Sequence, residues 1–212
     1  MMQELRDGKL SLVKFGPLGP FANNAYVISD ADTRDAVIID APQGSEKVLP
    51  ALEGLRVRRI IVTHRHGDHW GGIEVLREKT SAPVLCHAED AIDRQVDGTL
   101  EDEADLAVGS LRLRVLFTPG HTPGSICLLA GSHLISGDTL FPGGPGRTMR
   151  PEDLHQEIES IKAKLFVLPE ATVVHPGHGD DTTIGDAKRE YAIFASKEHP
   201  AGLSGDVTWL GS

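Results

Sequence analysis

Cysteine is scarce in this sequence. The chain has 212 residues but only two cysteines, Cys86 and Cys127, each inside an apolar run. Two such thiols do not make the disulfide framework of a small secreted protein, and the N-terminal residues lack the apolar core and cleavage motif of a signal peptide. We therefore expect buried thiols and a cytoplasmic location.

Positive charge and long apolar runs are lacking as well. Lysine and arginine number 21 against 31 aspartates and glutamates, so the formal net charge is −10. Binding to nucleic acid or to an anionic membrane needs clustered positive charge, and no apolar run approaches the roughly 18 residues of a transmembrane helix. We expect neither nucleic acid nor a membrane as a partner, and the pattern indicates no particular oligomeric state.

Short apolar segments fall into two groups, each followed by helical patterns. Strands are predicted over residues 10–15, 25–29, 36–40, 59–63 and 83–87, and again over 111–117, 126–130, 133–136 and 171–175. Helices are predicted from Ser45, over 71–79, from Pro151, and after the capping pair Thr183 and Asp186. This order predicts an α/β (α+β) fold in which helices cover two sheets.

The connections give further expectations. No linker is long enough to separate two domains, so we expect a single domain over residues 1–212. Residues 142–146 (P-G-G-P-G) exclude regular structure and predict a rigid, exposed loop. We expect a short loose tail after about residue 199, with Trp209 as the residue that could pack against the body.

The densest group of polar side chains directly follows the predicted strand 59–63. In residues 63–69 (T-H-R-H-G-D-H), four potential metal ligands fall within six positions. Residues two apart on extended backbone point to the same side, so His64 and His66 can reach one ion together. The turn at Gly67 can direct Asp68 and His69 to a neighbouring point. Imidazole and carboxylate ligands favour zinc, iron or manganese over a soft thiolate site.

Three further segments have the same character, because each is a glycine-flanked turn after an apolar strand. They are 118–124 (T-P-G-H-T-P-G) with His121, 136–139 (S-G-D-T) with Asp138, and 175–179 (H-P-G-H-G) with His175 and His178. Glycine permits the close backbone approach that a crowded site needs. Each segment is a weak signal alone, but together with residues 63–69 they predict one metal centre.

The H-x-H-x-D-H motif of residues 64–69, followed in order by His121, Asp138 and His178, resembles the metallo-β-lactamase superfamily. The segments T-P-G-H-T-P-G-S, S-G-D-T-L-F and P-G-H-G-D-D-T-T-I-G are most similar to its glyoxalase II-like branch, the hydroxyacylglutathione hydrolase-like proteins. The likeness covers about residues 10–194. It implies a four-layer αββα sandwich of two mixed sheets flanked by helices, with the metal site at one edge.

The resemblance also implies a set of ligands for two divalent metal ions, zinc being expected and iron or manganese the alternatives. The seven ligands divide into two triads and one shared residue: His64, His66 and His121 for the first ion, Asp68, His69 and His178 for the second, and Asp138 bridging both. His178 is preferred to His175 because the second histidine of H-P-G-H-G occupies the family's position. His175 is expected at a strand end or in support of the ligands.

The implied activity is the hydrolysis of a small-molecule thioester or ester. A hydroxide that bridges the two ions would be the nucleophile, since bound metal lowers the pKa of water toward 7. Asp68 would orient this nucleophile or take its proton. Arg147, in a G-P-G-R-T segment similar to the branch's G-x-G-R, is the candidate for binding a substrate carboxylate. Asp40 is expected to support the site loop by hydrogen bonding.

Departures from the family's pattern narrow the classes of substrate that we expect. Asp138 stands where β-lactamases of the superfamily usually carry cysteine, so β-lactam hydrolysis is not expected. Full-length glyoxalase II has a further helical domain that helps to hold glutathione, whereas one helix and a short tail follow His178 here. This difference weakens the case for a glutathione thioester.

Other functions remain as alternatives. Persulfide dioxygenases are similar to the same branch and use one iron held by two histidines and an aspartate, which would here be His64, His121 and Asp138. The segment around His178 favours the two-metal hydrolase. Other hydrolases of this fold, such as lactonases, and a binding protein with a silent site are further alternatives, although all seven ligands are present.

Overall fold

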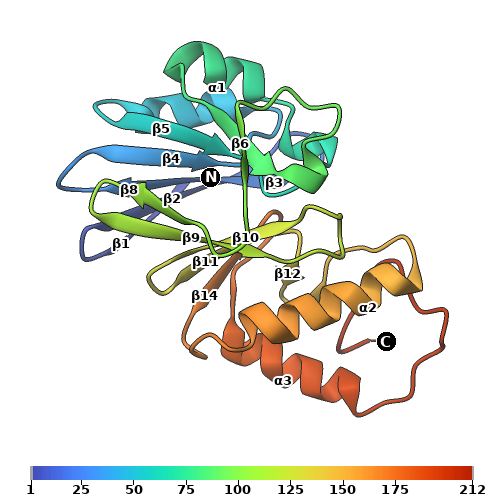
Figure 1. The fold of residues 1–212 in the computed structure, drawn as a ribbon. Coiled ribbons are helices and arrows are strands. Elements are labelled where there is room, and N and C mark those ends of the chain that lie inside the picture. Colours follow the sequence, from blue (N-terminus) through green and yellow to red (C-terminus); the bar gives the residue numbers. More distant parts are fainter. Residues whose placement is uncertain (1, 212) are drawn as a thin grey trace.

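The computed structural model describes residues 2–211 and has the predicted two-sheet α/β architecture. Seven strands form the first sheet in the order β1-β2-β3-β4-β5-β6-β7, and six form the second in the order β15-β14-β11-β10-β9-β8. Figure 1 shows α1 on the outer side of the first sheet, and α2 and α3 on the outer side of the second. The expected αββα layering is therefore confirmed.

The N-terminal half of the chain forms the first sheet. Its strands are β1 (Met2–Asp7), β2 (Leu10–Leu18), β3 (Asn23–Asp30), β4 (Asp35–Ile39), β5 (Arg56–Ile61), β6 (Val84–His87) and β7 (Gly98–Leu100). Pairing is antiparallel from β1 to β4 and parallel from β4 to β7. The strands β4 and β5 end level with each other, with Ile39 opposite Ile61. Asp40 therefore lies beside the start of the histidine-rich loop.

The second sheet contains β8 (Asp105–Val108), β9 (Leu111–Phe117), β10 (Ile126–Ala130), β11 (His133–Gly137), β14 (Val173–Pro176) and β15 (Thr182–Thr183). All neighbours are antiparallel except β11 and β14, which run parallel with Gly137 opposite Pro176. Because parallel strands end at the same edge, the loops that carry Asp138 and His178 begin side by side at this edge of the sheet. A separate ribbon joins β12 (Leu140–Phe141) to β13 (Gly144–Pro145).

Each predicted helical segment contains a helix, and two short 3₁₀ helices lie where none was predicted. They are η1 (Ser45–Leu52), η2 (Gly67–His69), α1 (Ile73–Thr80), η3 (Ala88–Asp90), α2 (Pro151–Ser160) with its π-helical continuation η4 (Ile161–Leu165), and α3 (Ile184–Ala195). Thr183 caps α3 as predicted, since its Oγ1 accepts a hydrogen bond from the Asp186 amide at 3.1 Å. The segment from Ser45, η1, is a 3₁₀ helix that contains Pro50, a residue with no N–H to donate to a helical ladder.

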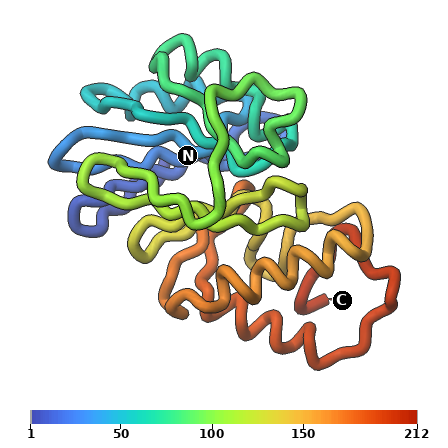
Figure 2. The backbone as a smooth tube through the Cα atoms, viewed as in Figure 1, coloured from blue at the N-terminus to red at the C-terminus, as the bar shows by residue number. Residues whose placement is uncertain are grey.

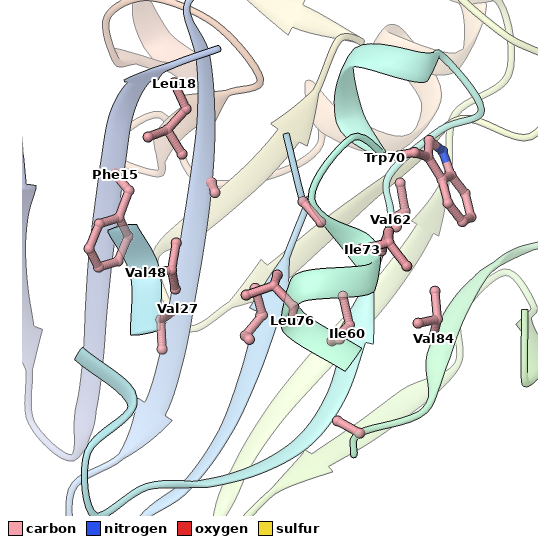
Figure 3. Packing of buried hydrophobic residues seen from close by; sticks show 14 of the residues in the cluster. Phe15, Leu18, Val27, Val48, Ile60, Val62, Trp70, Ile73, Leu76 and Val84 are labelled. Atoms are coloured by element: carbon pink, nitrogen blue, oxygen red, sulfur yellow. The ribbon is translucent and has the colours of Figure 1, made fainter. Parts of the chain in front are cut away.

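Three apolar clusters separate the four layers, and the alternation of side chains along the strands explains them. In β3, Ala25 and Val27 face the cluster under η1 and α1, whereas Tyr26 and Ile28 face the cluster between the sheets. A third cluster packs α2, η4 and α3 on the second sheet. Figure 3 shows the first cluster, including Phe15, Leu18, Val27, Val48, Ile60, Val62, Trp70, Ile73, Leu76 and Val84.

Residues 142–146 differ from the exposed loop that their composition predicts. Gly144 and Pro145 pair with β12, and they are buried together with Gly146. A Cβ added at Gly146 would collide with the backbone carbonyl of Asp138 and approach the ring of His121. Glycine at this position is explained by close packing against Asp138 and His121 rather than by exposure.

The segment after α3 is anchored rather than loose. Figure 2 shows the chain leave α3, make a wide loop and return toward the body. Trp209 is fully buried, its backbone amide donates to the Gly143 carbonyl at 2.7 Å, and its ring contacts those of Phe166 and Tyr191. Among residues 2–211, no helix is both long and apolar enough to cross a membrane.

Candidate metal centre

The structure brings all seven sequence-predicted ligands together at one edge of the two sheets. Four sit in the loop and η2 turn after β5, namely His64, His66, Asp68 and His69; the other three come from the β9–β10 loop, the end of β11 and the end of β14. Four loops far apart in the sequence thus meet because their strands end at the same edge.

The first predicted triad is a compact group of imidazole rings. His66 Nδ1 lies 2.8 Å from His121 Nε2, and the two rings meet edge to face. His64 adds a third nitrogen, and the ligand atoms of the three residues lie within 4.8 Å of one another. This spacing lets one ion contact all three residues.

The second predicted triad adjoins the first. His178 Nε2 lies 3.4 Å from Asp68 Oδ2, and His69 Nε2 lies 3.6 Å from the same oxygen. These ligand atoms are also within 4.8 Å of one another. A carboxylate with two imidazoles is a ligand set for zinc, iron or manganese.

Asp138 lies between the two triads. Its Oδ1 is 3.5 Å from His69 Nε2, and its Oδ2 is 3.4 Å from His178 Nε2 and 3.7 Å from His121 Nε2. One carboxylate therefore reaches ligands of both groups, as a bridging residue must.

Hydrogen bonds on the far side of the rings decide which nitrogen faces the cluster. Four histidines have an oxygen atom within 3.1 Å of Nδ1: His64 beside Thr63 Oγ1, His69 beside Asp40 Oδ2, His121 beside the Arg147 carbonyl and His178 beside the Phe21 carbonyl. When Nδ1 donates to these acceptors, the Nε2 lone pair is left for a metal ion.

Buried polar atoms without hydrogen-bond partners indicate whether a metal ion fits this cluster. Within the described part of the chain, His64 Nε2, His69 Nε2 and Asp138 Oδ1 are buried and have no hydrogen-bond partner. An unsatisfied buried polar group costs about 1–3 kcal/mol, so three of them close together need an explanation. A bound cation supplies one, and the donor set fits it.

The charge states of the two triads differ. Burial lowers the pKa of His64, His66 and His121, which favours the neutral imidazole that binds metal. Burial opposes the charged form of His178 too, but hydrogen bonds to Asp138 and Asp68 outweigh it and raise its pKa to about 10. Without metal, the second triad therefore holds a proton where a metal ion would bind.

Supporting side chains hold the ligands in place. Asp40 accepts hydrogen bonds from the Thr63 amide at 2.8 Å and from His69 Nδ1 at 2.9 Å, which confirms its predicted role. Asn23, which the sequence analysis missed, donates to Asp68 Oδ2 at 2.8 Å. It lies at the start of β3, 45 residues from Asp68 in the sequence, and no local pattern could have revealed it.

Asp90 is a second residue that the sequence analysis missed. It is fully buried in η3 and accepts hydrogen bonds from the Arg65 amide at 2.9 Å and from Thr122 Oγ1 at 2.5 Å. Arg65 lies between two ligands of the first triad, and Thr122 directly follows the third. One carboxylate thus joins the two loops that form this triad.

An open cleft of about 640 Å³ lies in front of the cluster. Its walls include the largely exposed apolar side chains of Phe21 and Met149 together with Arg147, the predicted carboxylate-binding residue. The Arg147 side chain is exposed, and its backbone carbonyl lies 2.8 Å from His121 Nδ1.

His175 is placed away from the cluster, as expected. It is buried in β14, where Nε2 lies 3.1 Å from His133 Nδ1 and Nδ1 lies 2.9 Å from Asp181 Oδ2. Asp181 in turn binds Lys14 Nζ at 2.6 Å. These contacts fasten both ends of the loop that carries His178.

The family model of the metallo-β-lactamase superfamily matches residues 18–178. The chain belongs to this superfamily. Its relatives include a Bacillus subtilis protein named as a probable metallo-hydrolase, which is 35% identical over 79% of this chain and 90% of its own. A hydroxyacylglutathione hydrolase of Alkalilimnicola ehrlichii is 40% identical over 74% of this chain. The match spans only 62% of that enzyme's length, but the predicted glyoxalase II-like branch is supported.

Solved structures of the superfamily share this fold, but their names do not point to one activity. BLEG-1, a B3 metallo-β-lactamase, is 33% identical with a TM-score of 0.75, and the match covers 88% of this chain and 95% of that one. ETHE1 from Myxococcus xanthus is 31% identical with the same TM-score, covering 93% and 86%. A third protein, solved in a di-iron-bound form, is 32% identical with a TM-score of 0.69 and coverage of 83% and 96%. Overall similarity therefore does not select one activity.

Proposed function

We propose that this superfamily member is a hydrolase of small-molecule thioesters or esters that uses two divalent metal ions. The observation that carries the proposal is the division of seven ligands into two adjoining triads joined by Asp138. The hydroxyacylglutathione hydrolases among the relatives, at 34–40% identity, support a thioester as substrate.

Zinc is the metal that we propose, with iron or manganese as alternatives, because imidazole and carboxylate ligands suit all three. The first ion would be held by His64, His66 and His121, and the second by the triad of Asp68. When bound, the metals supply Lewis-acid chemistry, which lowers the pKa of water and polarises a carbonyl group. Cys86 and Cys127 are both buried free thiols, which supports a reducing, cytoplasmic location.

The side chains of this protein would orient the reactants. Burial disfavours the charged form of Asp68, but hydrogen bonds from His178 and Asn23 outweigh it and lower its pKa, so the carboxylate is ionised at neutral pH. It can accept a proton from a water molecule in the cleft, while Asn23 holds its orientation. Arg147, on the cleft wall, is the proposed contact for a substrate carboxylate.

Metal analysis of protein purified without a chelating tag tests the proposal. We expect about two ions per chain and hydrolysis within a panel of thioesters and esters. A β-lactam belongs in the same panel, because one structural relative is a B3 metallo-β-lactamase. One iron per chain without zinc, together with oxygen consumption on a persulfide, would overturn the hydrolase and favour the mononuclear dioxygenase, whose ligands would be His64, His121 and Asp138.

A further inference from the structure

The C-terminal strap, residues 204–209, forms one wall of the cleft in front of the metal centre. Asp206, Val207 and Thr208 line the cleft. Gly205 exchanges two backbone hydrogen bonds with Thr148, of 2.9 and 3.2 Å, and the buried Trp209 fixes the end of the strap. The wall is therefore held at both ends.

The pairing of the strap sets one charged residue against another. Thr148 and Gly205 form an antiparallel bridge, so the preceding Arg147 and the following Asp206 lie directly opposite each other. Arg147 Nε is 3.8 Å from Asp206 Oδ2, and the two side chains are 64% and 82% exposed. An ion pair this exposed contributes little to stability, so either partner can be exchanged for a charged group of a ligand.

Charge is sparse elsewhere in the cleft. Among the described residues that line it, Arg147 is the only lysine or arginine, and Asp206 is the only acidic residue outside the metal centre. Much of the remaining wall is apolar, with Phe21 and Met149 65% and 78% exposed. A substrate carboxylate that binds Arg147 must therefore compete with Asp206.

We propose that Asp206 is a specificity-determining residue of this cleft. It competes with substrate carboxylates for Arg147, so it weakens the preference of the cleft for thioesters or esters that place a carboxylate next to Arg147. The inference rests on the proposed function and extends it to the class of substrate.

A matched pair of substrates tests the proposal: acetyl thioesters of 3-mercaptopropionate and of its uncharged amide. The measured quantity is the ratio of kcat/KM for the carboxylate to that for the amide, with zinc-loaded protein. We expect Asp206→Asn to raise this ratio about threefold to tenfold, as expected for removal of a partly screened like charge. Arg147→Gln should lower it, and in the Arg147→Gln background Asp206→Asn should have a smaller effect.

Glu198→Gln is the matched control, because it removes one exposed negative charge from the same part of the chain without lining the cleft. It should leave the ratio unchanged. An unchanged ratio in Asp206→Asn, or an equal increase in both variants, would overturn the proposal.

A binding measurement separates this inference from the proposed function. Calorimetry with 3-(methylthio)propionate and its amide needs no hydrolysis, so it tests the competition even if neither thioester is a substrate. Asp206→Asn should tighten binding of the carboxylate by the same threefold to tenfold, relative to the amide. If neither thioester is hydrolysed but this change is seen, only the proposed thioester activity fails. If both are hydrolysed and binding is unchanged, only the role of Asp206 fails.

Discussion

Nδ1 of His69 lies 2.9 Å from Oδ2 of Asp40, and both side chains are fully buried. Burial disfavours a charged His69, but the adjacent carboxylates of Asp40 and Asp138 outweigh it and raise its pKa. The contact holds the ring so that Nε2 lies within 3.6 Å of carboxylate oxygens of Asp68 and Asp138. Asp40, which lies outside the candidate ligand groups, thus orients a predicted ligand of the second triad.

Asp40→Asn should weaken binding of the second metal ion by about 10-fold to 100-fold, the usual cost of removing a group that orients a metal ligand. Competition with a chromophoric chelator measures both affinities. Asp32→Asn, the same change at an exposed position of the β3–β4 turn, should alter neither. Two unchanged affinities in Asp40→Asn would show that the contact does not orient the ligand.

Asp68→Asn should lower kcat by at least about 10²-fold, because it removes the carboxylate that accepts the proton. Folding should change far less, which thermal unfolding of the metal-loaded protein can show. Metal content must be measured on the same sample, since Asp68 is also a predicted ligand. Near-normal turnover in a fully metal-loaded variant would remove Asp68 from the mechanism.

Gly177→Ala should abolish tight binding at the second triad. A Cβ at this position would collide with the carboxylate of Asp138 and press on the ring of His69. Gly67→Ala is the control, because it lies between ligands but has nothing within 4 Å of the added methyl group. Elemental analysis should find about one ion per chain in the first variant and about two in the second. Equal metal content in the two variants would contradict the inferred clash between the added methyl group and Asp138.

Metal binding should release protons and strengthen as the pH rises. The pKa of His178 is raised to about 10 in the absence of metal, so a metal ion at neutral pH must displace a proton. The raised pKa also stabilises the metal-free folded protein against unfolding. This contribution to the free energy of unfolding is fully present below pH about 6.5, the ordinary pKa of histidine, and is lost as the pH rises toward 10. Calorimetric metal titration in buffers of different ionisation enthalpy counts the protons. Metal binding to the His178→Gln variant should release about one proton fewer. An equal number of released protons would show that His178 does not hold the displaced proton.

Trp209→Ala should destabilise the protein by about 3–5 kcal/mol, the usual cost of emptying a large buried aromatic site. Urea unfolding of the metal-loaded protein measures the change. Leu210→Ala removes a neighbouring side chain that is 54% exposed, and it should change the stability by less than about 0.5 kcal/mol. Similar values for the two variants would mean that the strap does not depend on Trp209.

Most of the candidate metal centre could be predicted from the sequence because its predicted ligands follow strands and are marked by local spacing. His64, His66, Asp68 and His69 stand within one short motif, and glycines flank the other three. The cap formed by Thr183 and Asp186 was equally visible, since both partners lie within one helical turn. Strands and helices were predicted from apolar periodicity, which depends only on neighbouring residues.

The family, the layered fold and the candidate ligands can be inferred from the chain alone, because motif spacing and apolar periodicity are properties of residues close together in sequence. Which distant residues support and surround those ligands depends on how the chain folds. Asn23 reaches Asp68 because β3 passes beside the metal centre, and Asp206 opposes Arg147 because the strap pairs with Thr148. Such contacts arise from how separate strands and loops pack, and no spacing within one segment records them.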